Sequence, residues 1–184
     1  MRIAAILYEA DKGPAADALL TGIARSFRAR GLKLAGAVQS NVAQPGRSRC
    51  DILLEDLASG RVVEASENRG PMASGCRLDA GALEDIVGLS AASLAPETAL
   101  VIVNKFSKRE AEGHGFRPLI EQAAVLDIPV LVAVKPAHLD AWTSFVGGAP
   151  TLLPLDEETV TRWCETVITR KAPHEAMTLS SIRP

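Results

Sequence analysis

Residues 8–17, YEADKGPAAD, lie between an apolar run at residues 3–7 and a helix-like run that begins near Pro14. A loop that joins a buried strand to a helix leaves the first N–H groups of that helix without intrahelical partners. These N–H groups and the positive end of the helix dipole favour a negatively charged ligand. Lys12 adds a positive charge to the same loop. The segment therefore predicts an anion site, formed by Asp11, Lys12, Gly13, Pro14 and Ala15.

The same segment departs from the phosphate-binding signature G-x-x-x-x-G-K-[ST]. In that signature, glycines let backbone N–H groups wrap the phosphates, the lysine contacts the outer phosphates and the hydroxyl holds magnesium. Placed by the strand-loop-helix context, its four positions fall on Tyr8, Gly13, Pro14 and Ala15, and only Gly13 matches. Anion binding at the helix terminus survives this loss, whereas magnesium-dependent hydrolysis is harder to retain. A plain turn without a ligand stays open as the alternative.

Hydrophobic patterning predicts the elements that must position this loop. Residues 3–7, 99–103 and 129–134 are apolar and rich in β-branched residues, as is typical of buried parallel strands. After the first of these strands, Pro14 suits the first turn of a helix that continues to Arg30 with apolar residues at helical spacing, and the strand-like run KLAGAVQ follows it. The order of strands and helices predicts βαβ units with right-handed crossovers.

Residues 41–75 interrupt this pattern. Two polar loops enclose the short strand-like runs DILLEDL and RVVEA, which are joined by ASG and predict a β-hairpin insertion. A helix follows from about residue 79, where Asp79 is the expected N-cap. We predict a three-layer α/β domain over residues 1–170, with a mostly parallel sheet, a P-loop-like plan and this hairpin. Residues 171–184 lack periodicity and are expected to form a loose tail.

Composition narrows the functional classes. With 47% hydrophobic residues and a formal net charge of -2 over 184 residues, the chain is typical of a soluble globular protein and not of a general nucleic-acid binder. It has no apolar stretch of about 18 residues and opens without a targeting pattern, so a cytoplasmic location away from membranes is expected. No metal site is predicted, because the cysteines and histidines lack ligand spacing. The roles of Cys50 and Cys76 stay open.

Three segments, in this order, carry a family resemblance: the strand-loop-helix opening, residues 36–84, which begin GAVQSNVAQPGRSRC and end CRLDAGALE, and residues 99–134, which begin ALVIVNKFSKREAEG. Together they resemble the small P-loop nucleoside triphosphatases related to nucleotide kinases, in which a strand ending in Asp-Glu carries magnesium and water chemistry. More closely, the degenerate loop, CRLD and VNKF resemble an uncharacterised bacterial family. That family is named only as a domain of unknown function and is often encoded beside molybdate-transport and molybdenum-enzyme genes.

The chain departs from the triphosphatase pattern at the strand end. The acidic pair expected after ALVIV falls on Asn104 and Lys105, so a carboxylate becomes an amide and another becomes a cation. Both ends of the usual magnesium site are then missing, because the loop has also lost its hydroxyl at Ala15. A tetrahedral dianion could be held there without metal by the helix dipole, backbone amides, the side-chain amide of Asn104 and the ammonium groups of Lys12 and Lys105. A solvated loop lysine is the alternative for Lys105.

Other charged residues are secondary candidates. Arg47, Arg49 and Arg69 lie in the loops of the insertion and could close over an anion as a lid, or be solvated loop arginines. Glu110 lies near a position where triphosphatases keep an acidic residue, which makes it the remaining candidate for a catalytic base. The favoured alternative is that KREAE is an exposed, charged loop or helix start on the surface.

The sequence favours a non-hydrolytic protein that binds a nucleotide or a phosphate-like oxyanion, such as molybdate, tungstate, phosphate or sulfate. The family resemblance implies a role in molybdenum or tungsten handling. A nucleoside triphosphatase or kinase-like enzyme, with Lys12 as phosphate lysine and Glu110 as base, is the first alternative. A protein-interaction module that uses the hairpin as its surface is the second. Homodimerisation through the insertion stays open.

Overall fold

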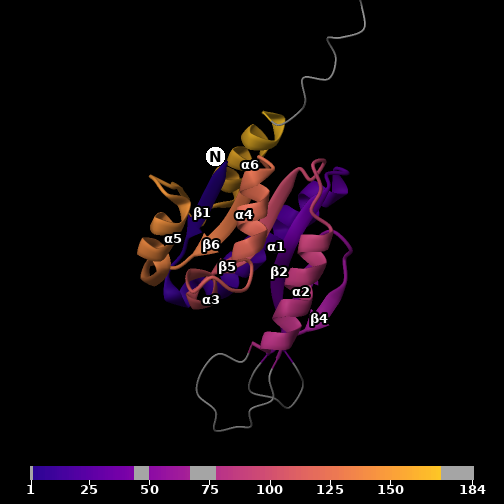
Figure 1. The fold of residues 1–184 in the computed structure, drawn as a ribbon. Helices are drawn as coiled ribbons and strands as arrows, with labels where there is room; N and C mark the ends of the chain where they lie inside the picture. The colour runs from indigo at the N-terminus through magenta and orange to yellow at the C-terminus, as the bar shows by residue number, and fades with distance from the viewer. Residues whose placement is uncertain (1, 44–49, 67–77, 171–184) are drawn as a thin grey trace, which may run out of the picture.

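The computed structural model describes residues 2–43, 50–66 and 78–170, which form a seven-stranded sheet with helices on both faces (Figure 1). The strands are β1 (Ile3–Leu7), β2 (Leu34–Val42), β3 (Asp51–Asp56), β4 (Val62–Glu64), β5 (Leu100–Phe106), β6 (Val130–Val134) and β7 (Thr151–Leu153). Their spatial order is β4-β3-β2-β5-β6-β1-β7. The run from β2 to β7 is parallel and the β3–β4 hairpin is antiparallel, which confirms the mostly parallel α/β fold expected from the sequence.

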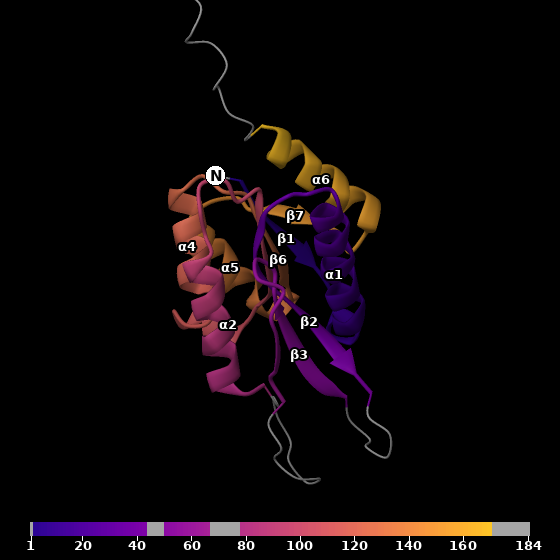
Figure 2. The same ribbon diagram turned by 90° about the vertical axis from the view of Figure 1, so that its right-hand side faces the viewer.

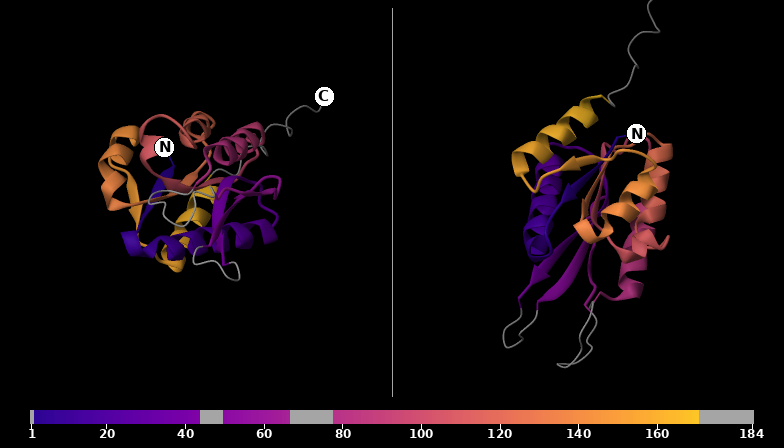
Figure 3. Two further views of the ribbon diagram at one scale, coloured as in Figure 1. Left: turned by 90° about the horizontal axis from the view of Figure 1, so that it is seen from below. Right: turned by 90° about the vertical axis from the view of Figure 1, so that its left-hand side faces the viewer.

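Helices cover the two faces of the sheet unequally. The α-helices are α1 (Gly13–Ala29), α2 (Ala80–Ala92), α3 (Lys108–Ala111), α4 (Arg117–Val125), α5 (Leu139–Val146) and α6 (Glu157–Thr169), with 3₁₀ turns η1 (Ala10–Lys12) and η2 (Pro136–His138). α1 and α6 lie on one face, and α2, α4 and α5 lie on the other (Figures 2 and 3). Each face has its own apolar core. The three layers follow from strands that are apolar on both sides.

Helix α1 matches its predicted bounds to within one residue at each end. Pro14 occupies the first turn, where its missing N–H costs nothing, and Gly31 follows the last turn with φ of 79°. The buried face carries apolar side chains and one carboxylate, Asp17. That buried charge is the exception in an otherwise ordinary amphipathic helix.

The predicted insertion prolongs the main sheet. β3 pairs antiparallel with β2 from Asp51 opposite Val42 to Asp56 opposite Ala37, and β4 then pairs with β3. The buried Asp56 closes the hairpin, because its carboxylate accepts hydrogen bonds from Ser59 and from Ser90 of α2 (Ser90 Oγ to Asp56 Oδ1, 2.7 Å). The hairpin is therefore tied to α2 as well as to β2.

Helix α2 and the C-terminal residues bear on two further expectations. The predicted N-cap of α2 is confirmed, since Asp79 Oδ1 accepts a hydrogen bond from the Ala82 N–H at 2.7 Å. The tail at residues 171–184 lies outside the described residues. Within the described residues, no helix is long and apolar enough to cross a membrane.

A β-bulge interrupts β5 at its carboxyl end. Val103 pairs with Val132 and Phe106 with Val134, so β5 has one residue more than β6 over this interval. The bulged stretch contains Asn104 and Lys105. Bulges re-aim side chains and are frequent beside functional sites, so both residues can leave the strict alternation of a strand.

At Gly36, β2 leaves no room for a side chain against the backbone of β5. The φ of Gly36 is +94°, and a Cβ there would lie 2.0 Å from the Ile102 carbonyl oxygen. A side chain therefore requires both an unfavourable backbone conformation and displacement of β5.

We expect Gly36→Ala to lower the free energy of unfolding by about 2–5 kcal/mol, combining left-handed strain with overpacking. Urea denaturation followed by tryptophan fluorescence would measure the change. Gly22→Ala is the matched control, because Gly22 is exposed within α1 and a Cβ there meets nothing within 4 Å. The control should gain about 0.5–1 kcal/mol from helix propensity. Equal stability of the two variants would contradict the close approach of β2 to β5.

Candidate functional site

The carboxyl ends of the parallel strands meet at the lower edge of the sheet in Figure 1. Tyr8 and Lys135 directly follow β1 and β6, while Gln39 lies in β2 and Asn104 in the β5 bulge. Ligands of open α/β sheets bind outside the carboxyl ends of the strands. Polar and ionisable side chains from four neighbouring strands thus gather where this fold holds ligands.

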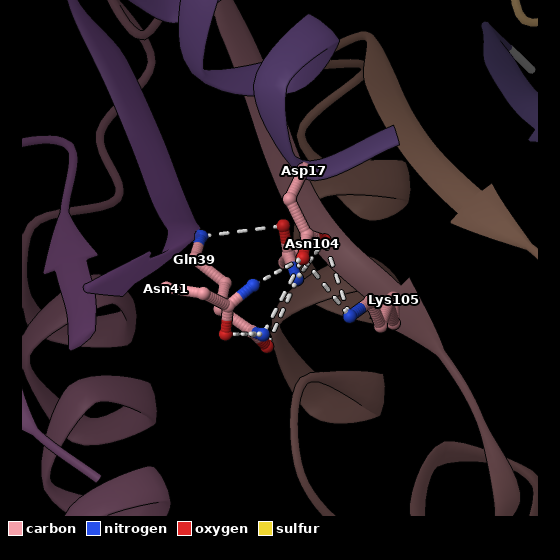
Figure 4. A network of polar contacts seen from close by, with 5 residues as sticks. All are labelled: Asp17, Gln39, Asn41, Asn104 and Lys105. Carbon is pink, nitrogen blue, oxygen red and sulfur yellow. Dashed lines mark hydrogen bonds and ion pairs between the residues drawn. The ribbon is translucent and has the colours of Figure 1, made fainter. Parts of the chain in front are cut away.

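The buried carboxylate of Asp17 is the centre of this group (Figure 4). Its Oδ1 lies 3.1 Å from Lys105 Nζ and accepts a hydrogen bond from Asn104 Nδ2 at 3.2 Å. Its Oδ2 accepts from Asn41 Nδ2 at 3.2 Å and Gln39 Nε2 at 3.4 Å. We call these five residues the Asp17 network. It joins the second turn of α1 to β2 and β5.

The amides of the network also satisfy one another. Asn104 Oδ1 accepts from the Gln39 backbone N–H at 3.2 Å, and Asn104 Nδ2 donates to Gln39 Oε1 at 3.3 Å. Gln39 Nε2 donates to Asn41 Oδ1 at 3.1 Å. Both polar atoms of the Asn104 amide therefore have protein partners, and this side chain orients Asp17 in the structure.

Lys105 is an ion-paired lysine and its charge is not isolated. Its side chain is 30% exposed, against 6% for that of Asp17, so the pair lies at the border of the core. The two charges cancel, and a buried carboxylate without such a partner would be strongly destabilising. The ammonium keeps further N–H donors that can face a ligand.

Tyr8 lies against the same group. Burial, and to a smaller extent the negative charge of Asp17, raise the pKa of its phenol to about 12. Lys135 Nζ lies 5.8 Å from the centre of the Tyr8 ring. Tyr8 consequently stays protonated at neutral pH. Lys135, which directly follows β6, is a second lysine at this edge of the sheet.

The loop after β1 is a single 3₁₀ turn that runs directly into α1. The Lys12 N–H donates to the Glu9 carbonyl at 2.9 Å, and its exposed ammonium lies 3.7 Å from the Asp11 carboxylate. Pro14 has no N–H, and a Cβ on Gly13 would meet nothing within 4 Å. Ala15 is exposed in the first turn. Of the five predicted residues, Asp11 and Lys12 lie in η1 and Gly13, Pro14 and Ala15 open α1, in a tighter loop than the phosphate-binding signature describes.

Glu110 is buried and caps the short helix α3. Its Oε2 accepts from the Ser107 backbone N–H at 2.9 Å and Ser107 Oγ at 2.7 Å, and its Oε1 accepts from the Phe116 N–H at 3.3 Å. The sequence favoured an exposed loop or helix start: the helix start is correct, but the surface position is wrong, because the capping bonds hold the carboxylate in the interior. The carboxylate already serves three donors, so its evident role is to hold α3 against the start of α4.

A cavity of about 430 Å³ adjoins the network on the α2 face of the sheet. Its wall combines apolar side chains of the hairpin and helices with the polar strand ends, and is formed by Gln39, Ile52, Leu54, Leu78, Leu83, Asn104, Lys105, Ser107, Arg109, Glu110 and Phe116. Among the described residues, no group of three or more His, Cys, Asp or Glu is placed to hold a metal ion. Organic ligands of ordinary size occupy pockets of this volume.

The remaining predicted residues are placed as follows. Arg47, Arg49, Arg69 and Cys76 lie outside the described residues, and Cys50 is exposed. The sequence interpretation missed the residues that complete the site: Tyr8, Asp17, Gln39, Asn41 and Lys135. A signal existed for Asp17, whose carboxylate lies one position after Ala16 on the apolar face of the predicted helix.

Tyr8 is the single tyrosine of the chain, so phenolate absorbance at 295 nm reports it alone. We expect the folded protein to titrate near pH 12 and the urea-unfolded chain near about pH 10. Because the pKa of Tyr8 is higher in the folded than in the unfolded protein, the protonated phenol favours the folded state. This contribution to stability is complete below pH 10 and is lost as the pH rises towards 12. Asp17→Asn should lower the folded midpoint only in part, since burial is the larger cause. A folded midpoint near 10 would contradict the placement of Tyr8.

Replacing the Glu110 carboxylate separates a structural role from a catalytic one. We expect Glu110→Gln to lower the free energy of unfolding by about 1–2 kcal/mol, because an amide cannot accept all three hydrogen bonds. Chemical denaturation would measure the loss. Glu112→Gln is the control, since Glu112 is an exposed residue beside α3 whose contact with Lys108 is 3.7 Å long. Unchanged stability of Glu110→Gln would show that the cap contributes little.

Comparison with known proteins places the chain in a family. The family model described as "Protein of unknown function (DUF2478)" matches residues 3–163. A protein of Bradyrhizobium diazoefficiens, named molybdenum import ATP-binding protein ModC 2, is 35% identical over 162 residues. That match takes in 88% of this chain but only 18% of the length of that protein. No solved structure matches the chain. Because the family match runs from β1 into α6, the chain belongs to the DUF2478 family.

Proposed function

We propose that this chain binds a phosphate-like oxyanion, or the phosphate end of a nucleotide, at the start of α1 without metal-assisted hydrolysis. The ion pair between Lys105 and Asp17 carries this proposal. In the P-loop triphosphatases that the sequence resembles, this end of the strand supplies carboxylates for magnesium and water. Here a lysine of the chain itself stands beside the buried carboxylate, so that carboxylate is already neutralised.

The proposed anion would draw on donors around the first turn of α1. The helix terminus offers unpaired N–H groups and about half a positive charge. Lys12 adds a charge whose contact with Asp11 is exposed and therefore weak, and Lys135 adds another from β6. Lys105 would contribute its remaining N–H donors and no net charge, because Asp17 cancels it. Asn104 would act by holding Asp17 in place.

Two features speak for binding without hydrolysis. The first turn of α1 has Pro14 and Ala15 where a phosphate loop has its lysine and its magnesium-binding hydroxyl. Glu110 is the candidate base of the triphosphatase alternative, but its carboxylate is hydrogen-bonded to three donors in its capping role. A general base needs a free lone pair directed at its substrate, so the triphosphatase alternative loses support.

The ligand class is narrowed by the relative in Bradyrhizobium diazoefficiens, whose name includes molybdenum import and ATP binding. Because the match spans only 18% of that protein, molybdenum import and ATP binding are applied to this chain only as part of the proposal. The ligands to be tested are therefore molybdate, tungstate and a nucleoside triphosphate, in a domain that serves molybdenum or tungsten handling in the cytoplasm.

Thermal unfolding with molybdate, tungstate, sulfate, ATP or GTP, each with and without magnesium, tests the proposal. A ligand at about 100 times its Kd stabilises by about 2.7 kcal/mol, which corresponds to roughly 5–11 °C for a chain of this size. We expect one of these anions to give such a shift without magnesium. Lys12→Gln and Lys135→Gln should each weaken binding about tenfold, by losing one charge-assisted hydrogen bond.

Lys33→Gln is the matched control. Lys33 is exposed before β2, at the opposite end of the sheet, and pairs with Glu97 at 3.1 Å. Its loss should leave every ligand shift unchanged. Stabilisation by a nucleotide only in the presence of magnesium would contradict the metal-free site. Absence of any shift would contradict the proposal as a whole and favour an interaction module.

A further inference from the structure

The cavity beside the Asp17 network is walled by two kinds of side chain. Ile52 and Leu54 of β3, Leu83 of α2 and Phe116 before α4 form its apolar part. The polar part lies along the strand ends and α3. This division resembles that of small-molecule sites, in which a few polar groups orient a ligand whose body is buried among apolar side chains.

The polar wall has unused hydrogen-bond donors and few unused acceptors. The amides of Gln39 and Asn104 bond to each other and to Asp17, and the Glu110 carboxylate accepts three hydrogen bonds. Among the described residues, the Lys105 ammonium forms its ion pair and hydrogen bond with Asp17 alone. The hydrogen-bonding groups of this wall that are still available to a ligand therefore belong to cationic side chains.

Arg109 is the second cation of the cavity. Its nearest acid in the described part of the chain is Glu84, with Nη2 3.9 Å from Oε1, too far for a hydrogen bond. Its side chain is 38% exposed, so the guanidinium can turn towards a ligand without leaving a buried gap. A guanidinium presents a planar set of N–H donors that matches a carboxylate, sulfonate or phosphate.

The volume favours an organic ligand over a bare oxyanion. A cavity of about 430 Å³ is within the range of pockets that hold small organic ligands, whereas a tetrahedral oxyanion would fill only a small part of it. An oxyanion alone would leave the apolar wall in contact with water. A ligand with an apolar body of ring size would cover that wall and gain hydrophobic free energy.

We propose that this cavity binds a small organic anion, with its apolar body against Ile52, Leu83 and Phe116 and its acidic group on Lys105 and Arg109. The site goes beyond the oxyanion site proposed at the start of α1. The two sites share Lys105 and the amides that hold Asp17, but Arg109 belongs only to the cavity and Lys12 only to the oxyanion site, so each can be lost without the other.

The anionic dye 8-anilinonaphthalene-1-sulfonate is a suitable probe, and uncharged N-phenyl-1-naphthylamine has the same rings without the sulfonate. Calorimetry and fluorescence titration of the folded protein should show one dye molecule bound per chain. Arg109→Gln should weaken binding of the sulfonate about tenfold and leave the uncharged dye unchanged, because only the sulfonate bonds to the guanidinium. Glu84→Gln should leave sulfonate binding equal or tighter, since it removes the competing carboxylate.

Arg162→Gln is the matched control, because Arg162 is an exposed arginine of α6 that pairs with Glu158 and takes no part in the cavity wall. It should bind both dyes like the unaltered protein. Lys12→Gln should also leave dye binding unchanged, and Arg109→Gln should leave the oxyanion shift unchanged, which separates failure of this proposal from failure of the first. Equal sulfonate affinity in Arg109→Gln and the unaltered protein would overturn it. The proposal would also be overturned if neither this dye nor naphthalene-2-sulfonate bound at a single site.

Discussion

The buried carboxylate of Asp17 constrains the arrangement around it more than any other single group. An ionised carboxylate in the core costs several kcal/mol unless charge and hydrogen bonds compensate it. Compensation comes from β2 through Gln39 and Asn41, and from β5 through Asn104 and Lys105. Helix α1 therefore has to sit where its second turn meets both strands. The start of α1, where the proposed anion would bind, is positioned by the same requirement.

Two backbone features make this compensation geometrically attainable. In a regular strand, Asn104 and Lys105 would point to opposite faces of the sheet. The additional residue of the β5 bulge relaxes this alternation, so both side chains reach one carboxylate. Gly36 lets β2 lie against the backbone of β5, where a Cβ would be 2.0 Å from the Ile102 carbonyl oxygen, and β2 carries Gln39 three residues further on. The polar network thus depends on a backbone irregularity within β5 as well as on its side chains.

This dependence explains which features the sequence could predict. Strand and helix periodicity are local, and so the parallel strands, the bounds of α1, the hairpin and the Asp79 cap were accessible from residue patterns. Asp17 was not, because its partners lie up to 88 residues away and the bulge that presents Lys105 has no local signature. Lys105 could be identified as a cation at the strand end, but its pairing could not. Glu110 was expected on the surface in a charged loop or helix start, whereas its burial involves a bond to Phe116, the residue before α4.

The pairing of Lys105 also limits how any ligand can use it. A ligand that drew the ammonium away from Asp17 would leave a buried carboxylate with only amide donors, at a cost that can exceed the new contact. Lys105 can therefore donate to a ligand only while it keeps its bond to Asp17. Such a lysine supplies direction and hydrogen bonds in place of net charge, so affinity for an anion has to come from Lys12, Lys135 or Arg109. Ligands that carry an acidic group together with a large complementary body would gain most from this arrangement.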